Sequence, residues 1–271
     1  MGSIGPDGLR QGAEEARRRR TLGPFRHTGP GPEAIRMIGT IKDRLHAWQR
    51  RLTAKIGGDI STAPARRAAR WHYQLVDHGF LRAMWRNLHQ IAPQVYRSNQ
   101  PSDRQLAALH KSVGLKTVLN MRGKSKNSFY LFEAETCEKH GITLVDLPMS
   151  ASEAPSRQKL HQLIATLRAV EKPLLMHCKS GADRTGLAAV LYLLLVEKRP
   201  YAEAKAQLSL RYLHVANSPA GVQDHLLRCF EAAERQTGIG FEDWLQNEYD
   251  PAQVTASFAR WRAGDRVLGN V

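Results

Sequence analysis

From residue 91 onward, short apolar segments alternate along the chain with longer segments of helical periodicity. Four of the short segments are bounded by turn residues and are predicted to be strands: QVYRSN (94–99), KTVLNMR (116–122), ITLVDLP (142–148) and PLLMHC (173–178). Alternation of this kind is typical of a mostly parallel sheet flanked by helices. We therefore predict an α/β fold with a central sheet of four to five strands.

The predicted helices complete this main domain, which we place at residues 91–250. Ser102 and Gln105 form a capping box for a helix that ends near Val113. Further helices are predicted over 129–140, 156–170, 185–197, 200–212, 221–236 and 241–249. We expect a less ordered tail over 251–271.

The first 90 residues carry most of the excess positive charge. The net charge is +15, and residues 1–72 contain 15 of the 40 Lys and Arg but only 6 of the 25 Asp and Glu. Residues 1–32 are predicted to be a disordered basic tail, because they have almost no large apolar residues. Residues 33–90 are predicted to be a helical extension, with a basic amphipathic helix over 33–56 and a second helical stretch from about Ala63 to Leu88.

Two interpretations of the helix over 33–56 fit its pattern. Its apolar stripe packs on the domain or on another copy of the chain, or it lies on an anionic membrane surface. The N-terminus lacks the apolar core of a secretion signal, and we expect no lipid anchor.

The segment MHCKSGADRTG (176–186) carries the strongest functional signal. The predicted strand delivers Cys178 to the carboxyl end of the sheet, where open α/β folds bind ligands. Gly181 permits a turn whose amides converge on an anion, and Thr185 begins a helix whose dipole favours negative charge. Arg184 offers a planar fork for two phosphoryl oxygens, and Thr185 can donate its hydroxyl to the sulfur. We predict a phosphate-binding loop with Cys178 as a thiolate nucleophile, formed by Lys179, Ser180, Gly181, Ala182, Asp183 and Arg184.

The spacing of cysteine and arginine is weak evidence by itself. Cys229 and Arg235 have the same spacing, but they lie in a helical pattern without glycine and beside glutamates that oppose a thiolate. We predict that this second pair is structural.

The segment from His177 to Gly186 resembles the signature of the cysteine-dependent protein tyrosine phosphatase superfamily, in its compact dual-specificity branch. VYRSNQP (95–101) and VLNMR (118–122) are similar to the opening strands of bacterial dual-specificity-like phosphatases and their plant and fungal atypical relatives. The resemblance covers about residues 91–235. It implies a phosphomonoester hydrolase in which Cys178 forms a phosphocysteine that water then hydrolyses, with no metal or other cofactor.

The resemblance places the general acid in the loop after the third strand, where two carboxylates are candidates. Asp146 lies 32 residues before Cys178, as in many family members, but inside the predicted strand. Glu153 lies just before Pro155, where the acid of the family normally sits. Both candidates stay open, and the structural alternative for Asp146 is a strand-end carboxylate with local hydrogen bonds.

The variable positions of the loop bear on the substrate. Lys179 adds positive charge, as in lipid-directed relatives, whereas Ala182 stands where those relatives often have a second lysine. Asp183 before the arginine resembles bacterial phosphatases credited with both phosphoprotein and phosphoinositide activity. We expect a phosphorylated protein, phospholipid or inositol phosphate as substrate, and no nucleic-acid partner.

Three further residues are predicted to support the loop. Arg97 and Arg122 are predicted to be salt-bridged scaffolding, and His177 is predicted to form a hydrogen bond with the loop from beneath.

Two other functions are less consistent with the sequence. An arsenate reductase generally needs resolving thiols, and Cys137 and Cys229 lie on distant predicted helices. A catalytically silent pseudophosphatase is disfavoured because the loop has kept its nucleophile, glycine, arginine and threonine. Three cysteines without C-x-x-C spacing favour a reducing cytoplasm, and the basic extension would allow a peripheral position at the inner membrane face.

Overall fold

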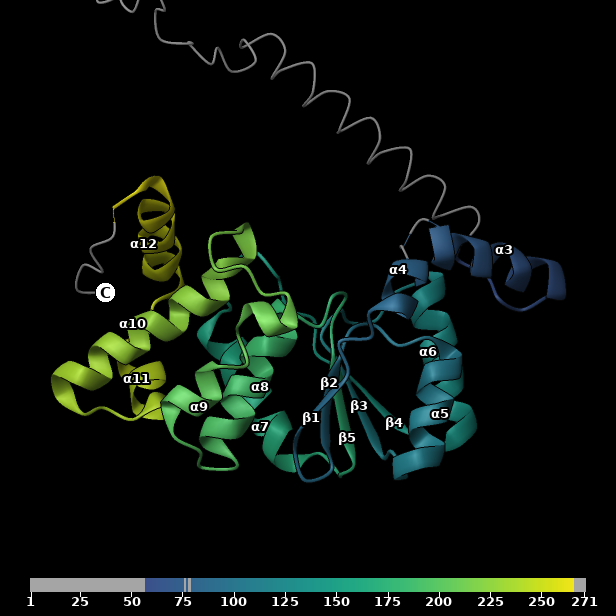
Figure 1. The fold of residues 1–271 in the computed structure, drawn as a ribbon, viewed down its shortest axis with the longest axis horizontal. Helices are drawn as coiled ribbons and strands as arrows, with labels where there is room; N and C mark the ends of the chain where they lie inside the picture. The colour runs from purple at the N-terminus through teal and green to yellow at the C-terminus, as the bar shows by residue number, and fades with distance from the viewer. Residues whose placement is uncertain (1–56, 76, 78, 266–271) are drawn as a thin grey trace, which may run out of the picture. The chain divides into compact units, whose positions relative to one another are not determined.

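A five-stranded sheet forms the centre of the structure (Figure 1). The structure is a computed structural model, and it describes residues 57–75, 77 and 79–265. The predicted tail over 1–32 and the predicted helix over 33–56 lie outside the described residues. The strand order is β1-β2-β5-β3-β4, with β1 (His89–Ala92), β2 (Val95–Ser98), β3 (Thr117–Asn120), β4 (Thr143–Asp146) and β5 (Leu174–His177).

The sheet is mostly parallel, as the sequence predicts. Strands β2, β5, β3 and β4 run in the same direction, and β1 pairs with β2 in the antiparallel direction. In the register, Ser98 lies opposite His177, His177 opposite Asn120, and Asn120 opposite Asp146. The last residues of four strands therefore form one row at the carboxyl edge, and Cys178 follows this row directly.

Helices cover both faces of the sheet (Figure 1). Alternate residues of β5 point to opposite sides, so that Leu174 and Met176 join one apolar cluster and Leu175 joins another. On the first side lie α7 (Arg157–Ala169) and α8 (Asp183–Leu195), and on the second lie α5 (Asp103–Val113) and α6 (Ser128–His140). Helix α8 is buried along almost its whole length, because α7, α9 (Tyr201–Lys205) and α10 (Val222–Thr237) also pack against it.

Local sequence signals set the ends of these helices. Ser102 accepts a hydrogen bond from the Gln105 amide, and the Gln105 side chain accepts one from the Ser102 amide, which confirms the capping box. Ser156 caps α7 in the same position. Gly114 and Gly141 end α5 and α6 with left-handed backbone angles.

The extension departs from the prediction of one helical stretch from Ala63 to Leu88. It is divided into α3 (Ala63–Leu75) and α4 (Gly79–Met84), and the side chain of Asp77 is buried between them. The chain then forms β1, an edge strand that the sequence analysis missed. This strand has only four residues, its burial does not alternate, and it ends in a turn at Gln94, so it lacks the pattern of a half-buried strand.

The predicted helix over 200–212 is wrong beyond its first turn. Helix α9 covers only Tyr201–Lys205, and the chain continues through the 3₁₀ helices η1 (Leu210–Tyr212) and η2 (Pro219–Gly221). The helix ends early because of a tertiary contact, in which the Gln207 carbonyl accepts a hydrogen bond from the buried Arg97 guanidinium at 2.7 Å.

The expectation of a less ordered segment after Pro251 is also wrong for residues 251–263, and residues 266–271 lie outside the described residues. Three helices complete the domain: α10 (Val222–Thr237), α11 (Phe241–Asn247) and α12 (Pro251–Ala263). The Asp250 carboxylate accepts hydrogen bonds from the amides of Ala252 and Gln253, and α12 packs against α10. None of the helices in the described ranges combines the length and the apolar character that crossing a lipid bilayer requires.

We expect Phe258→Ala to lower the free energy of unfolding by about 3 kcal/mol. The Phe258 ring is buried, stacks on Trp261 and contacts His225 of α10, so its loss leaves a cavity. Urea-induced unfolding followed by circular dichroism measures the change. Thr255→Ala, an exposed position on the same helix, is the control, and equally small losses in both variants would show that α12 contributes little to stability.

Candidate active site

The loop after β5 has a backbone that only glycine permits. Gly181 has a φ of 74°, and a Cβ atom there would lie 2.6 Å from the backbone of Ser98 and Asn99. Strand β2 thus approaches the loop so closely that no side chain fits at this position. The loop is packed against the sheet edge in the place that the sequence analysis predicts.

Arg97 supports this loop from the sheet. Its guanidinium is buried, with one nitrogen donating to the Gly181 carbonyl at 2.7 Å and the other to the Gln207 carbonyl at 2.7 Å. The ring of Tyr212 lies 3.8 Å from the guanidinium carbon. Burial lowers the pKa of Arg97 to about 10, so the side chain is still charged at neutral pH. Arg97 is therefore scaffolding, as predicted, but it binds backbone carbonyls in place of the expected acidic partner.

Cys178 lies at the bottom of the loop with 1% of its surface exposed. Its sulfur accepts a hydrogen bond from the Gly181 amide at 3.3 Å. Burial raises the pKa of the thiol, but Arg184, the hydroxyl and amide of Thr185 and the Gly181 amide lower it by more, and the net shift is downward. The surroundings of Cys178 thus favour the thiolate, which is the nucleophilic form.

The Arg184 guanidinium is fixed by carbonyl oxygens from two neighbouring strand ends. Its Nη1 donates to the Met121 carbonyl at 3.1 Å and to the Met149 carbonyl at 3.2 Å. Its Nε is buried and has no partner within the described part of the chain. An orphaned donor of this kind is costly unless a ligand accepts from it, and a phosphoryl oxygen over the loop would do so.

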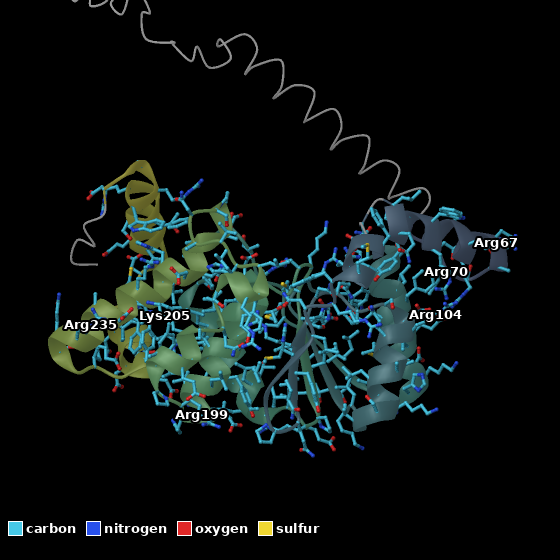
Figure 2. The ribbon with its side chains drawn as sticks, viewed as in Figure 1. Arg67, Arg70, Arg104, Arg199, Lys205 and Arg235 are labelled. Carbon is cyan, nitrogen blue, oxygen red and sulfur yellow. The ribbon has the colours of Figure 1, made fainter. Side chains whose placement is uncertain are left out.

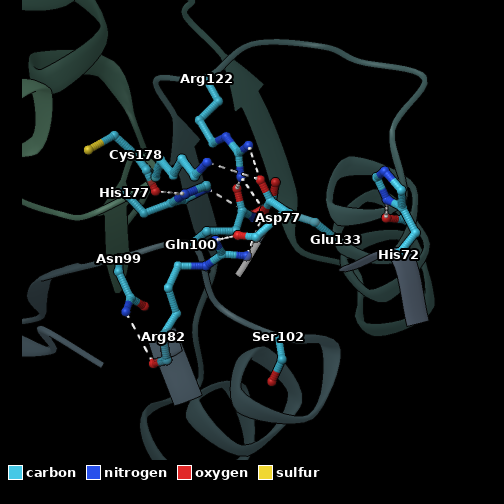
Figure 3. Close-up of polar contacts among 12 residues, drawn as sticks. His72, Asp77, Arg82, Asn99, Gln100, Ser102, Arg122, Glu133, His177 and Cys178 are labelled. Carbon is cyan, nitrogen blue, oxygen red and sulfur yellow. Dashed lines mark hydrogen bonds and ion pairs between the residues drawn. The ribbon is translucent and has the colours of Figure 1, made fainter. Parts of the chain in front are cut away.

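A buried polar network lies next to Cys178 (Figure 3). Nε2 of His177 lies 2.8 Å from Oε1 of Glu133, and neither side chain is exposed to solvent. The same oxygen accepts a hydrogen bond from Gln100 Nε2 at 3.0 Å, and Gln100 Oε1 accepts one from Arg122 at 3.1 Å. The network joins α6 and β3 to the residue before Cys178, and His177 lies at the base of the loop as predicted.

The extension reaches this network, which the sequence analysis did not foresee. Asp77 pairs with Arg122 at 3.0 Å and with Arg82 at 2.6 Å. The Asn87 side chain donates to the carbonyls of Ser180 at 3.1 Å and Tyr212 at 3.0 Å. Both residues stand in a segment predicted to lie outside the domain, and no local pattern marks them as contacts of the loop.

The remaining loop residues have distinct surroundings. Lys179 is exposed, with its Nζ 3.6 Å from Asp77, and the Ser180 hydroxyl accepts a hydrogen bond from the Ala182 amide. The Asp183 carboxylate lies 2.8 Å from the buried His214 ring. Asp183 therefore ties the start of α8 to the segment after α9.

The two candidate acids lie in different environments. Asp146 ends β4, and its oxygens accept hydrogen bonds from Asn120 at 2.8 Å and from the Tyr130 hydroxyl at 2.6 Å. Glu153 is exposed, in a segment whose carbonyls at Ser150 and Glu153 are held by the buried Gln223. This segment begins beside Met149, whose carbonyl binds Arg184. The hydrogen bonds of Asp146 are those of a structural carboxylate, whereas the Glu153 side chain is exposed to solvent.

The second cysteine–arginine pair has none of these features. Burial raises the pKa of Cys229 to about 11 and that of Cys137 to about 12. Cys229 lies inside α10, as the sequence predicts. Within the residues that the structure describes, no three His, Cys, Asp or Glu side chains converge as a metal site requires.

Comparison with curated proteins finds the dual specificity protein phosphatase TpbA from two Pseudomonas aeruginosa strains. The UCBPP-PA14 protein is 32% identical over 161 residues, and the PAO1 protein is 31% identical over the same length. The aligned region covers 56% of this chain and 66% of each relative, slightly under two thirds of their length.

Solved structures show a similar but more distant likeness. A P. aeruginosa TpbA crystal structure has a TM-score of 0.41 and 20% identity, covering 64% of this chain and 91% of its own. The active form of Tk-PTP has a TM-score of 0.43 and 22% identity, covering 55% of this chain and 99% of its own.

A protein-family model gives the family itself. The model described as "DSP-PTPase phosphatase fused to NAD+ Kinase" matches residues 76–220. This match contains the whole sheet and the loop that carries Cys178 and Arg184. Since it covers just over half of the 271-residue chain, the protein belongs to this family of dual-specificity-type phosphatases.

Proposed function

We propose that the chain is a cysteine-dependent phosphatase that hydrolyses phosphomonoesters through a phosphocysteine on Cys178. The observation that carries this proposal is the pairing of a stabilised thiolate with an orphaned arginine donor in one loop. A phosphate dianion placed over the loop would meet the charge of Arg184 and the open end of α8.

The first chemical step follows from these positions. The Cys178 sulfur attacks phosphorus, the bond from phosphorus to the ester oxygen breaks, and that oxygen leaves with a proton from a general acid. Arg184, held by the carbonyls of Met121 and Met149, follows the charge that spreads over the phosphoryl oxygens. Water then attacks the phosphocysteine, and the thiolate is the leaving group. Thr185 stabilises that leaving thiolate.

Glu153 is the general acid in this proposal. A general acid must give its own proton to the leaving oxygen, and both oxygens of Asp146 already accept protein hydrogen bonds. Glu153 is exposed in the segment that follows the Arg184 contact at Met149, and Gln223 fixes the backbone of that segment.

A phosphorylated protein side chain is the substrate class that we propose. The curated relatives are named dual specificity protein phosphatases, which supports this class. Phosphoinositides and inositol phosphates are the alternative substrates, and a phosphate-release panel with both substrate classes distinguishes them.

All three cysteines are buried free thiols, which supports placement of the protein in a reducing compartment such as the cytoplasm.

Cys178→Ser should lower the release of phosphate from p-nitrophenyl phosphate at least about 1,000-fold, because it removes the nucleophile. The matched control is Cys229→Ser, which changes the cysteine of the second pair and should keep activity within about twofold of the unchanged chain. A colorimetric phosphate assay measures both variants. If the unchanged protein releases no phosphate, the proposed hydrolysis is wrong and the site only binds anions.

The pH dependence of alkylation tests the thiolate. Since the pKa of Cys178 is lowered, its thiolate persists to lower pH, and the rate of its reaction with iodoacetamide should level off at a lower pH than for an ordinary cysteine, whose pKa is about 8.5. Cys137 and Cys229, whose pKa values are raised, should stay unmodified in the folded protein. Peptide mass spectrometry follows each site. A Cys178 rate that still climbs at alkaline pH would contradict the lowered pKa.

Glu153→Gln should lower kcat by about 100-fold for phenyl phosphate and less for p-nitrophenyl phosphate, whose leaving group needs less help from a proton. Asp146→Asn should keep the leaving-group dependence of the unchanged protein, because that carboxylate has a structural role. Steady-state kinetics with a series of aryl phosphates gives the comparison. The reverse result would assign the acid to Asp146.

A further inference from the structure

A single carboxylate from the extension holds the cations beside the phosphate loop. Asp77 is 7% exposed, and both of its oxygens are engaged. Oδ1 lies 3.0 Å from Arg122 Nη2 and 3.6 Å from Lys179 Nζ, and Oδ2 lies 2.6 Å from Arg82 Nη2. One negative charge thus faces three positive charges, and Figure 3 shows Arg82 and Arg122 beside Asp77.

This cluster differs from the ion pairs at the surface. Arg70 and Arg235 lie at opposite ends of the domain (Figure 2) and pair with Asp103 and Glu231 where solvent screens them. Asp77 is buried, and although burial raises its pKa, Arg122, Arg82 and Lys179 lower it by more. The carboxylate is therefore charged at neutral pH, and solvent screens its pairs with Arg82 and Arg122 less than it screens a surface pair.

Arg122 and Lys179 are the two partners that border the site. Lys179 follows Cys178 directly, and its side chain is about half exposed. Arg122 follows β3, next to Met121, whose carbonyl binds Arg184. The Arg122 guanidinium carbon lies over the Phe129 ring, 3.4 Å from its centroid, and two of the guanidinium nitrogens donate to Asp77. Without the Asp77 carboxylate, both cations would be available to an anion.

Arg82 has a different place in the cluster. It donates to the backbone carbonyl of Asp77 as well as to its carboxylate, so it fixes the break between α3 and α4. Arg82 also contacts the ring of Tyr73. These contacts hold Asp77 against Arg122 and Lys179.

We infer that Asp77 is a specificity-determining residue that reserves the site for substrates with a single phosphate group. Because Asp77 pairs with Arg122 and Lys179, these two cations do not bind a second phosphate group of a substrate. Arg184 then binds the phosphate group that reacts. The inference rests on the proposed function and narrows its substrate class to the phosphate monoester of a protein side chain, in preference to polyphosphorylated ligands.

Binding by a chain that cannot turn over tests the inference directly. Calorimetry on full-length Cys178→Ser protein compares inorganic phosphate with pyrophosphate, with and without Asp77→Asn. The substitution frees two cations for charge-assisted hydrogen bonds, so it should tighten pyrophosphate binding about tenfold more than phosphate binding. Lys179→Met added to Asp77→Asn should remove a measurable part of that gain.

A matched control distinguishes the loss of the ion pairs of Asp77 from a change in the net charge of the protein. Asp103→Asn removes one negative charge from the surface pair with Arg70, away from the loop, and should leave the ratio of the two affinities unchanged. An equal gain from Asp103→Asn, or an equal weakening of both ligands by Asp77→Asn, would overturn the inference. In the second case Asp77 would be scaffolding only.

Breaking a buried ion pair is costly. If Asp77→Asn does not fold for this reason, Lys179→Met tests the inference. With Asp77 present, Lys179→Met should change pyrophosphate binding by less than about threefold beyond its effect on phosphate. A tenfold selective loss would mean that Lys179 already reaches a second phosphate and would refute the inference. These readouts need no turnover, so a failure of the proposed hydrolysis would leave them interpretable.

Discussion

The negative charge on the Cys178 sulfur is buried, and the rest of the site depends on how that charge is balanced. Burial alone would keep the thiol protonated and unreactive, as it does for Cys137 and Cys229. Arg184, Thr185 and the Gly181 amide reverse the effect for Cys178. The same groups suit a phosphate dianion, so in the proposed reaction one arrangement would both stabilise the thiolate and bind the phosphoryl group that it attacks.

That arrangement is supported from below by residues far apart in the sequence. Arg97 holds the Gly181 carbonyl, and Glu133 fixes His177, the residue before Cys178. The extension then adds Asp77 and Asn87, which contact Arg122 and the Ser180 carbonyl. Asp77 and Asn87 therefore contact residues of the site, although both lie outside the predicted domain.

Local patterns in the sequence predict the four parallel strands, the capping box at Ser102 and the phosphate loop, because each depends on residues that are neighbours in the chain. Strand β1 escapes prediction because it is short and exists only by pairing with β2. The early end of α9 depends on the contact of Gln207 with Arg97. The contact of Asp77 with the site gives no local signal, since Arg122 and Lys179 are 45 and 102 positions away.

The identity of the nucleophile is the central claim, and trapping the covalent intermediate tests it most directly. The full-length protein is mixed rapidly with an aryl phosphate, quenched in acid and mapped by peptide mass spectrometry. We predict phosphate on the peptide that contains Cys178, and its loss in Cys178→Ser. Phosphate on another residue, or hydrolysis without any phosphocysteine, would contradict the account.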